Sequence, residues 1–216
     1  MHELGDSAAK GERGGGDGAA VRAAGLGRRP PDPGRARALA EAVLEHVLNH
    51  GREGLSLRSV AEALSVSTFS LTAHFGSRHG MIDAVIDILI ERQYARVQSA
   101  MTAAGDQGAG ASLRAVWQTC VENIHEDRLL IDVCTDRNGG AAVRRRLVDP
   151  WVQGTIAQLV ARGWPPVVAE TEATLVTACF SGLELDLITT GDLPRVCRAA
   201  ELMAATFDAR WAAPPA

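Results

Sequence analysis

The chain has 216 residues, of which 46% are apolar and 4% are aromatic, and its formal net charge is −4. That apolar share is ample for a packed core, and the net charge excludes a uniformly basic nucleic-acid-binding protein. Ala, Leu, Val, Arg and Glu dominate, which favours helices over strands. No stretch approaches the roughly 20 uninterrupted apolar residues of a membrane span, and the N-terminus lacks the pattern of a secretion signal. We therefore expect a cytoplasmic protein with no membrane partner.

Residues 1–34 are rich in Gly, Ala and Arg and end in the Pro-rich run Pro30 to Pro33. They have too little apolar periodicity to form a core, so we predict a disordered arm. Arg28 and Arg29 are candidates for contact with DNA phosphates or a minor groove, and a solvated tail without a specific role is the simpler interpretation.

Apolar residues that recur every three or four positions predict helices in the next part of the chain. These predicted helices cover about 35–50, 57–65, 68–76 and 78–101. Gly51 is placed to stop the first, and Val66 and Leu71 form a hydrophobic staple at the start of the third. The N-caps of the last three are Ser56, Ser67 and Ser77.

A Gly- and Ala-rich joint, Ala103 to Ala111, separates a second helical unit. Its predicted helices cover about 112–126, 128–135, 141–162, 166–190 and 193–211. Pro150 must kink or restart the third of these because it has no N–H for the i−4 hydrogen bond. The last two carry more apolar surface than one small bundle needs, and a helix–helix dimer would bury it.

The negative charge is unevenly distributed along the chain. Residues 35–84 contain five arginines and five acidic residues, whereas residues 101–216 contain ten arginines and fourteen acidic residues. Within the first range, the run from Leu64 to Ile82 contains no carboxylate. A surface that faces the polyanion DNA would avoid carboxylates in this way.

Two short helices joined by a tight turn have the plan of a helix-turn-helix, whose second helix fits the DNA major groove. The stretch SLRSVAEALSVSTFSLTAHFGSRHGMI resembles the N-terminal domain of the TetR family of bacterial transcriptional regulators. That family typically reads Thr-x-x-x-Ile-Ala-x-x-Ala-Gly-Val-Ser, followed by Leu-Tyr-x-His-Phe-x-x-Lys-x-x-Leu. The residues at corresponding places here are Ser56, Val60, Ala61, Leu64, Val66, Ser67, Leu71, His74, Phe75, Arg78 and Ile82.

The resemblance covers about residues 35–100 well and the C-terminal half loosely, through GLELDLITTGD and the final amphipathic helix. It implies an all-α protein with a three-helix helix-turn-helix DNA-binding domain over 35–84 and a helical effector-binding and dimerisation domain over 85–216. Two residues depart from the family pattern. Ser65 stands where Gly is usual in the turn, and Thr72 stands where the family usually has a Tyr that touches phosphate.

The family pattern and the side-chain chemistry assign roles on this surface. The candidates that face bases are Arg58, Thr68, Phe69 and Ser70. Phe69 could pack on a thymine methyl group. The candidates that face phosphates are Thr72, His74, Arg78 and the hydroxyl groups of Ser56 or Ser77, and Ser67 completes the DNA-binding set. A structural, partly buried histidine is the alternative for His74.

The sequence indicates no metal site and no cofactor. His46 and His50 lie at i and i+4 on one helix but have no third ligand nearby, so a solvated helix face is preferred. The cysteines are far apart and lack C-x-x-C pairing, so we predict reduced, small apolar side chains. They are Cys120, Cys134, Cys179 and Cys197.

Candidates for an effector cavity lie on the C-terminal helices. They are Trp117, Cys120, Trp151, Thr155, Phe180 and Glu184. Glu184 points toward the apolar side of its helix, where it could hold a cationic or hydroxylated ligand. The alternatives are a pair with Arg195, Arg198 or a dimer partner for Glu184, and plain core packing for the aromatic residues.

The resulting prediction is a homodimeric transcriptional repressor that binds a palindromic operator in double-stranded DNA and is released by a small-molecule effector. An activator or an effector-independent DNA-binding protein is the alternative with the same fold. An all-α enzyme with an active site assembled from distant residues is the third. No G-x-S-x-G, P-loop, G-x-G-x-x-G or H-E-x-x-H motif occurs, so we expect no enzymatic activity.

Overall fold

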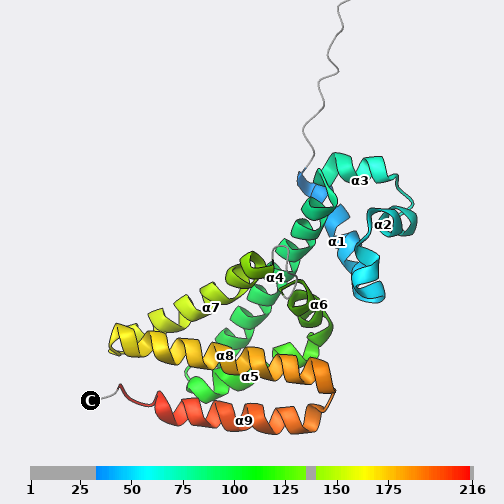
Figure 1. Ribbon diagram of the computed structural model, residues 1–216. Helices are drawn as coiled ribbons and strands as arrows, with labels where there is room; N and C mark the ends of the chain where they lie inside the picture. Colours follow the sequence, from blue (N-terminus) through cyan, green and yellow to red (C-terminus); the bar gives the residue numbers. More distant parts are fainter. Residues whose placement is uncertain (1–32, 135–139, 215–216) are drawn as a thin grey trace, which may run out of the picture. The chain divides into compact units, whose positions relative to one another are not determined.

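The computed structural model describes residues 33–134 and 140–214, and every regular element in these ranges is helical (Figure 1). In chain order the elements are α1 (Pro33–His50), the 3-10 helix η1 (Gly51–Leu55), α2 (Leu57–Ala63), α3 (Thr68–Phe75), α4 (Arg78–Ala104), α5 (Ala109–Glu122), α6 (Ile124–Cys134), α7 (Gly140–Ala161), α8 (Pro166–Thr190) and α9 (Leu193–Arg210). The predicted all-α fold is confirmed. Nearly all of the predicted arm, including Arg28 and Arg29, lies outside the described residues.

The predicted helices differ from the observed ones at several places, among them the break between α5 and α6, which falls at Asn123 rather than after residue 126. The short helix η1 was not expected, and α5 begins at Ala109, inside the predicted joint. Of the two outcomes predicted at Pro150, a kink or a restart, the restart does not occur, because α7 runs through this residue as one helix. The loss of one backbone hydrogen bond does not end a helix that packs against α6 and α8 along its length.

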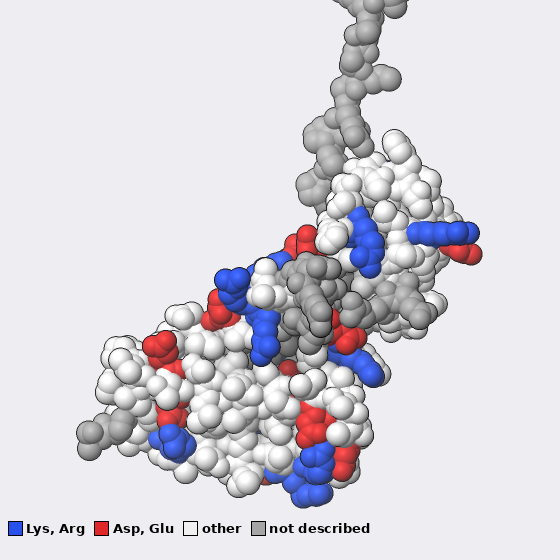
Figure 2. Space-filling view, in the orientation of Figure 1, with Lys and Arg blue, Asp and Glu red and all other residues white. Residues whose placement is uncertain are grey.

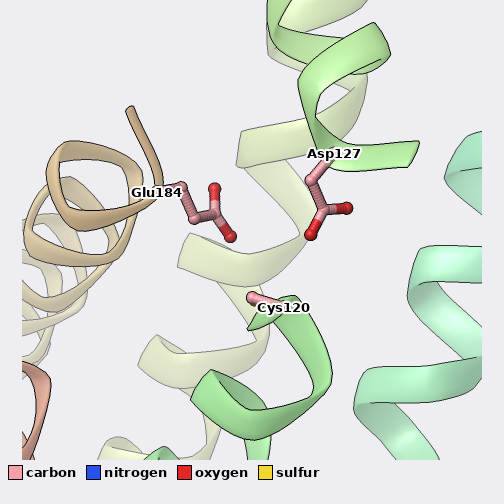
Figure 3. A group of neighbouring side chains, drawn as sticks. All are labelled: Cys120, Asp127 and Glu184. Atoms are coloured by element: carbon pink, nitrogen blue, oxygen red, sulfur yellow. The ribbon is translucent and has the colours of Figure 1, made fainter. Parts of the chain in front are cut away.

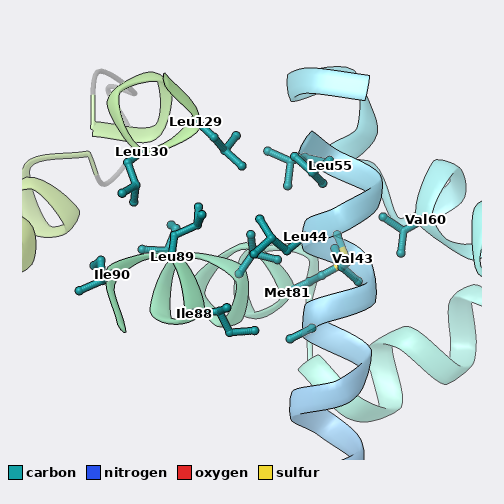
Figure 4. Close-up of a cluster of buried hydrophobic side chains, with 14 of the residues drawn as sticks. Val43, Leu44, Leu55, Val60, Met81, Ile88, Leu89, Ile90, Leu129 and Leu130 are labelled. Carbon is teal, nitrogen blue, oxygen red and sulfur yellow. The ribbon is translucent and has the colours of Figure 1, made fainter. Parts of the chain in front are cut away.

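The helices α1 to α4 share one continuous apolar core (Figure 4). The predicted stripe of α1 is buried, with Val43, Leu44 and Val47 fully enclosed. Leu71 of α3 and Met81 of α4 are also fully buried, so the start of α4 is fixed against α3 and α1. This core continues into α6 and α7, and α4 crosses the boundary predicted after residue 84. The division into two domains therefore remains a prediction.

The C-terminal helices pack around three smaller apolar clusters. One joins Trp117 of α5 to α8 and α9, a second centres on Trp164, and a third contains Phe207. The helices α8 and α9 run side by side in opposite directions, and α5 and α7 contact this pair (Figure 1). Asp192 caps α9 as predicted, since its carboxylate accepts a hydrogen bond from the N–H of Arg195 at 3.1 Å.

One side of α8 is apolar and uncovered. Leu175, Ala178, Gly182 and Leu185 recur at helical spacing and are all exposed, with Leu175 at 47% and Leu185 at 50%. Within the described part of the chain, α8 is the one helix that is long and apolar enough, by length and composition, to cross a membrane. Its other side packs against α7 and α9 and includes Glu172, which is buried and paired with Arg210. We therefore treat α8 as a helix of the bundle with one free apolar side.

Candidate DNA-binding surface and ligand cavity

The turn between α2 and α3 is tight although it lacks glycine. Ser65 has φ +53°, a left-handed backbone conformation that costs a residue with a Cβ atom about 1–2 kcal/mol. The N–H of Val66 donates to the carbonyl of Ala61 at 2.9 Å, which closes the turn. Val66 packs against the apolar core that contains the buried Leu71, which agrees with the predicted staple. The two helices are therefore held in a fixed relative position.

The three predicted capping serines cap their helices. In each, Oγ accepts a hydrogen bond from the backbone N–H three residues later, at 3.0 Å, 3.0 Å and 3.1 Å for Ser56, Ser67 and Ser77. All three residues are exposed. Because a capping hydroxyl uses an oxygen lone pair, its hydrogen remains available to donate to a phosphate oxygen.

The predicted base-facing residues lie on the outer surface of α2 and α3. Arg58, Thr68 and Phe69 are exposed, and Ser70 is half-buried. At 76%, Phe69 has the highest exposed fraction of the large apolar side chains in the described residues. It is therefore free to contact an apolar group on a partner, such as a thymine methyl.

Thr72 and His74 already use hydrogen-bonding groups within α3. The hydroxyl of Thr72 donates to the carbonyls of Thr68 and Phe69, at 3.1 Å and 3.0 Å. Nδ1 of His74 lies 2.8 Å from the carbonyl of Ser70, and a carbonyl only accepts, so Nδ1 carries the hydrogen. To donate to a phosphate, the hydroxyl of Thr72 must give up its hydrogen bonds to the backbone of α3. His74 needs no such change, because its bond to Ser70 uses Nδ1 and not Nε2.

Arg78, which was predicted to contact phosphate, makes a hydrogen bond within the protein. Its Nε donates to the carbonyl of Leu55 at 2.9 Å, which ties the start of α4 to the end of η1. The residue is nevertheless exposed. The guanidinium group has further N–H donors, so one side chain can brace the fold and still present hydrogens to a phosphate.

The surface over α3 carries no acidic side chain in the view of Figure 2. The sequence explains this, since the run from Leu64 to Ile82 contains no Asp or Glu. A duplex placed against α3 would therefore meet hydroxyl groups, one aromatic ring and arginines rather than like charge.

A cavity of about 160 Å³ lies between α4, α5, α7 and α8. For comparison, an engineered protein cavity of about 150 Å³ holds benzene. Five of the six residues predicted from the sequence line it: Cys120, Trp151, Thr155, Phe180 and Glu184. Trp151 also stacks on Tyr94 of α4, with ring centroids 4.5 Å apart, which fixes one wall.

Trp117 does not line this cavity. It is buried in the neighbouring cluster with Val196 and Ala200, and its indole N–H lies 3.4 Å from the sulfur of Cys197. The prediction placed it by spacing on the side of α5 that carries Cys120; the two residues lie only about 60° apart around the helix, and Trp117 packs toward α9. For Trp117, plain core packing is the observed role.

Glu184 lacks the arginine partner that the sequence analysis offered as an alternative. Arg195 pairs with Asp186 and Asp192, so it is not available to Glu184. Within the described residues Glu184 has no ion pair with Arg or Lys. Burial raises the pKa of its carboxyl, and a hydrogen bond from the thiol of Cys120 partly opposes this rise.

Three groups from three helices meet beside the cavity (Figure 3), and two of them, Cys120 and Glu184, line it. The sulfur of Cys120 and carboxylate oxygens of Asp127 and Glu184 all lie within 4.8 Å of one another. Burial raises the pKa of Asp127 to about 8, and the nearby charge of Glu184 adds to the rise. Burial likewise raises the pKa of the Cys120 thiol. We call these three residues the buried cluster.

Sequence reasoning missed Asp127 and also Gln93, whose amide N–H lies 3.4 Å from Oδ1 of Asp127. A local signal existed for Gln93, because it takes the place of an apolar residue between the buried Leu89 and Val97 at spacings of four. Asp127 carries a similar local signal, because this charged residue stands just before the buried Leu129 and Leu130. Their meeting with Glu184 is a tertiary contact that no local pattern contains.

The buried cluster adjoins a charged network that reaches α1. Glu126, next to Asp127, pairs with Arg96 and with Arg92, the latter at 3.0 Å. Arg92 in turn lies 3.7 Å from Glu45 of α1. Arg96 also approaches Asp127, with Nη2 3.6 Å from Oδ1. A shift of α6 would therefore be transmitted through Arg92 to α1, which packs behind the candidate DNA-binding surface.

Solved structures with similar arrangements of helices include transcriptional regulators and a multidrug binding protein. A transcriptional regulator from Rhodococcus sp. Rha1 aligns with a TM-score of 0.65 at 24% identity, over 79% of this chain and 94% of that chain. A TetR transcriptional regulator from Legionella pneumophila aligns with a TM-score of 0.61 at 14% identity, over 83% and 100%. The chain has the fold of the TetR-family regulators.

A third protein with the TetR-type fold is the multidrug binding protein EbrR in complex with imidazole. It aligns with a TM-score of 0.62 at 25% identity, over 86% of this chain and 98% of that chain. The sequence itself matches no family model and no curated protein. The three proteins are named for transcriptional regulation or for drug binding, and none of them is named for catalysis.

Proposed function

We propose that the protein is a transcriptional regulator that binds a specific site in double-stranded DNA through α3. The observation that carries this proposal is the outer surface of α2 and α3, with Arg58, Thr68 and Phe69 exposed and no acidic residue between Leu64 and Ile82. Arginine and hydroxyl groups recognise bases and phosphates, and an exposed aromatic ring suits a thymine methyl. The TetR-type fold supports the same function.

The proposed active species is a homodimer on a palindromic operator. The exposed stripe of α8, from Leu175 to Leu185, contains Ala178 and Gly182 at its centre. Small residues at that place allow the backbones of two helices to approach closely, and burial of the flanking leucines would stabilise the contact. A two-fold dimer presents two copies of α3, which matches an inverted repeat in DNA.

The cavity is the proposed effector site of a repressor. It combines aromatic walls from Trp151 and Phe180 with polar groups from Thr155 and Glu184, which suits a mainly apolar molecule with one or two polar groups. An effector can release DNA only through unequal affinity for two conformations, and a coupling of about 1–3 kcal/mol lowers DNA affinity about 5–150-fold. The helix α4 lines the cavity and also packs on α1, so it joins the two sites. Such a regulator acts in the cytoplasm.

The test is selection of duplexes from a random-sequence pool by the purified full-length protein. We expect an inverted repeat to be enriched, with half-sites about one helical turn apart or further. Arg58→Ala should weaken binding to the selected duplex, whereas Arg145→Ala, which removes an exposed arginine from α7, should not. The proposal fails if no sequence is enriched, or if the two arginine variants lose affinity equally.

A further inference from the structure

The buried cluster brings together one thiol and two carboxyl groups at a place with little access to water. Cys120 is 4% exposed and Asp127 is 2% exposed, and Glu184 faces both of them from α8 (Figure 3). Buried carboxylates need a cationic partner, because desolvation otherwise disfavours their charged form. The one cation near Asp127 in the described residues is Arg96, which is shared with Glu126. If all three groups of the buried cluster ionise, their negative charge exceeds the positive charge that Arg96 supplies.

A separate observation points to a ligand here. Gln93 is 8% exposed, and its Oε1 is buried without any hydrogen-bond partner. The amide group lies at the cluster, since its Nε2 is 3.4 Å from Oδ1 of Asp127, and Gln93 lines the cavity. An unsatisfied buried carbonyl oxygen costs stability unless a ligand completes it. The side chain of Gln93 therefore reaches the buried cluster with an unpartnered amide oxygen, and an amide oxygen is a kind of donor atom that binds metal ions.

We propose that Cys120, Asp127 and Glu184 bind a divalent cation of the zinc class, with Oε1 of Gln93 as the fourth ligand. A thiolate together with carboxylates suits zinc, whereas magnesium and calcium prefer oxygen ligands alone. Four ligands match the tetrahedral coordination of zinc. An organic cation needs only a carboxylate and aromatic walls, so it does not account for the convergence of the thiol and Asp127 on Glu184.

The charge of the occupied site would balance. Binding displaces the thiol proton of Cys120 and any protons on Asp127 and Glu184, and these protons pass to solvent. The metal contributes two positive charges against three negative ligands, and Arg96, 3.6 Å from Asp127, supplies the remaining positive charge. No oxidation or reduction is involved.

Occupation would also contract the site. Zinc bonds of about 2.0–2.3 Å place tetrahedral ligand atoms about 3.3–3.7 Å apart, which is closer than the present separations of up to 4.8 Å. The metal would thus draw α5, α6 and α8 together. Because Glu126 on α6 connects through Arg92 to Glu45 of α1, this movement would reach the DNA-binding helices. That last step rests on the proposed function, whereas metal binding does not.

The experiment titrates the full-length, metal-free protein with zinc against a chromophoric chelator and, separately, with cobalt(II) under reducing conditions. We expect one metal ion per chain and a thiolate-to-cobalt charge-transfer absorption band. Cys120→Ser should abolish that band, and Glu184→Gln should weaken zinc binding about 100-fold or more, since even outer-shell changes cost 10–100-fold. The matched controls Cys197→Ser and Glu201→Gln should leave the cobalt absorption band and the affinity for zinc unchanged. Circular dichroism verifies that each variant is folded.

The proposal is overturned if the wild type does not bind zinc, or if Cys120→Ser binds it as well as the wild type does. It is also overturned if the organic cation tetraphenylphosphonium binds in a Glu184-dependent manner while zinc does not. A final arm measures affinity for the selected duplex with and without zinc, and a change confined to proteins with Cys120 supports coupling. Zinc binding without any such change upholds the site and contradicts the coupling.

Discussion

The two groups of helices in this protein use their apolar residues in opposite ways. Helices α1 to α4 bury theirs in one continuous core and leave polar groups and Phe69 outside. The C-terminal helices add Leu129, Leu130 and Val143 to that core and divide most of their other buried apolar residues among three clusters near a cavity. They also enclose Asp127 and Glu184 and leave the apolar stripe of α8 uncovered. The first group is built to present a rigid surface, whereas the second has room for a ligand and a face for a partner.

The largest expected effect comes from the uncovered stripe. Ala178→Glu places a charge at the centre of the proposed dimer contact, so we expect monomers at micromolar concentration in sedimentation. Affinity for the selected palindrome should fall about 100-fold or more, because two linked half-sites no longer bind together. The matched control is Ala157→Glu, a change at another exposed alanine, on α7. If both variants remain dimers, α8 is not the interface.

The next effect tests how rigid the N-terminal group is. A Cβ atom on Gly80 would lie 2.1 Å from the carbonyl oxygen of Phe75, so Gly80→Ala must push α3 away from the start of α4. We expect a loss of about 1–3 kcal/mol in unfolding free energy, the usual range for overpacking, together with weaker DNA binding.

Gly154→Ala in α7 is the control, because nothing lies within 4 Å of the added atom. A helical Gly→Ala change of this kind should stabilise by about 0.5–1 kcal/mol. If Gly80→Ala and Gly154→Ala changed the unfolding free energy equally, the α3–α4 junction would be able to accommodate the added methyl group without cost.

The buried cluster predicts that the stability of the protein falls as pH rises. Asp127 has a pKa of about 8 in the fold against an ordinary value of 3.8, so the folded state binds more protons between these values. Stability should therefore fall as pH rises from about 4 to about 8, with a slope of at most about 1.4 kcal/mol per pH unit for this proton.

Urea unfolding at fixed protein concentration, with a chelator present, measures the free energy at each pH for the wild type and Asp127→Asn. The advantage of the wild type over the variant should shrink toward pH 8, because the variant has no carboxyl to ionise. A difference that does not change with pH would show that Asp127 ionises normally.

The N-terminal helices and the buried cluster also differ in how much of their structure can be predicted from the sequence. The caps Ser56, Ser67 and Ser77 and the stripe of α1 are local patterns, and the structure contains them as predicted. The buried cluster joins residues 57 and 64 positions apart along the chain, so spacing within one helix could not reveal it. The same limit explains Trp117, whose side of α5 was misjudged because the positions of α8 and α9 decide which side is core.

The smallest effect concerns the turn between α2 and α3. Ser65 adopts φ +53° where glycine is easier, so Ser65→Gly should raise the unfolding free energy by up to about 1 kcal/mol. Thermal unfolding of the two proteins at equal concentration measures the difference. A destabilised variant would mean that the Ser65 side chain makes a contact that outweighs its backbone strain.

The central claim is that α3 reads DNA sequence with the exposed ring of Phe69. The most direct measurement is fluorescence anisotropy of wild type and Phe69→Ala on the selected duplex and on every single-base-pair variant of it. We predict that Phe69→Ala loses about 1–3 kcal/mol of discrimination at one symmetric pair of positions and keeps the preference elsewhere. Unchanged discrimination at every position, or a uniform loss of affinity for all duplexes, would contradict the account.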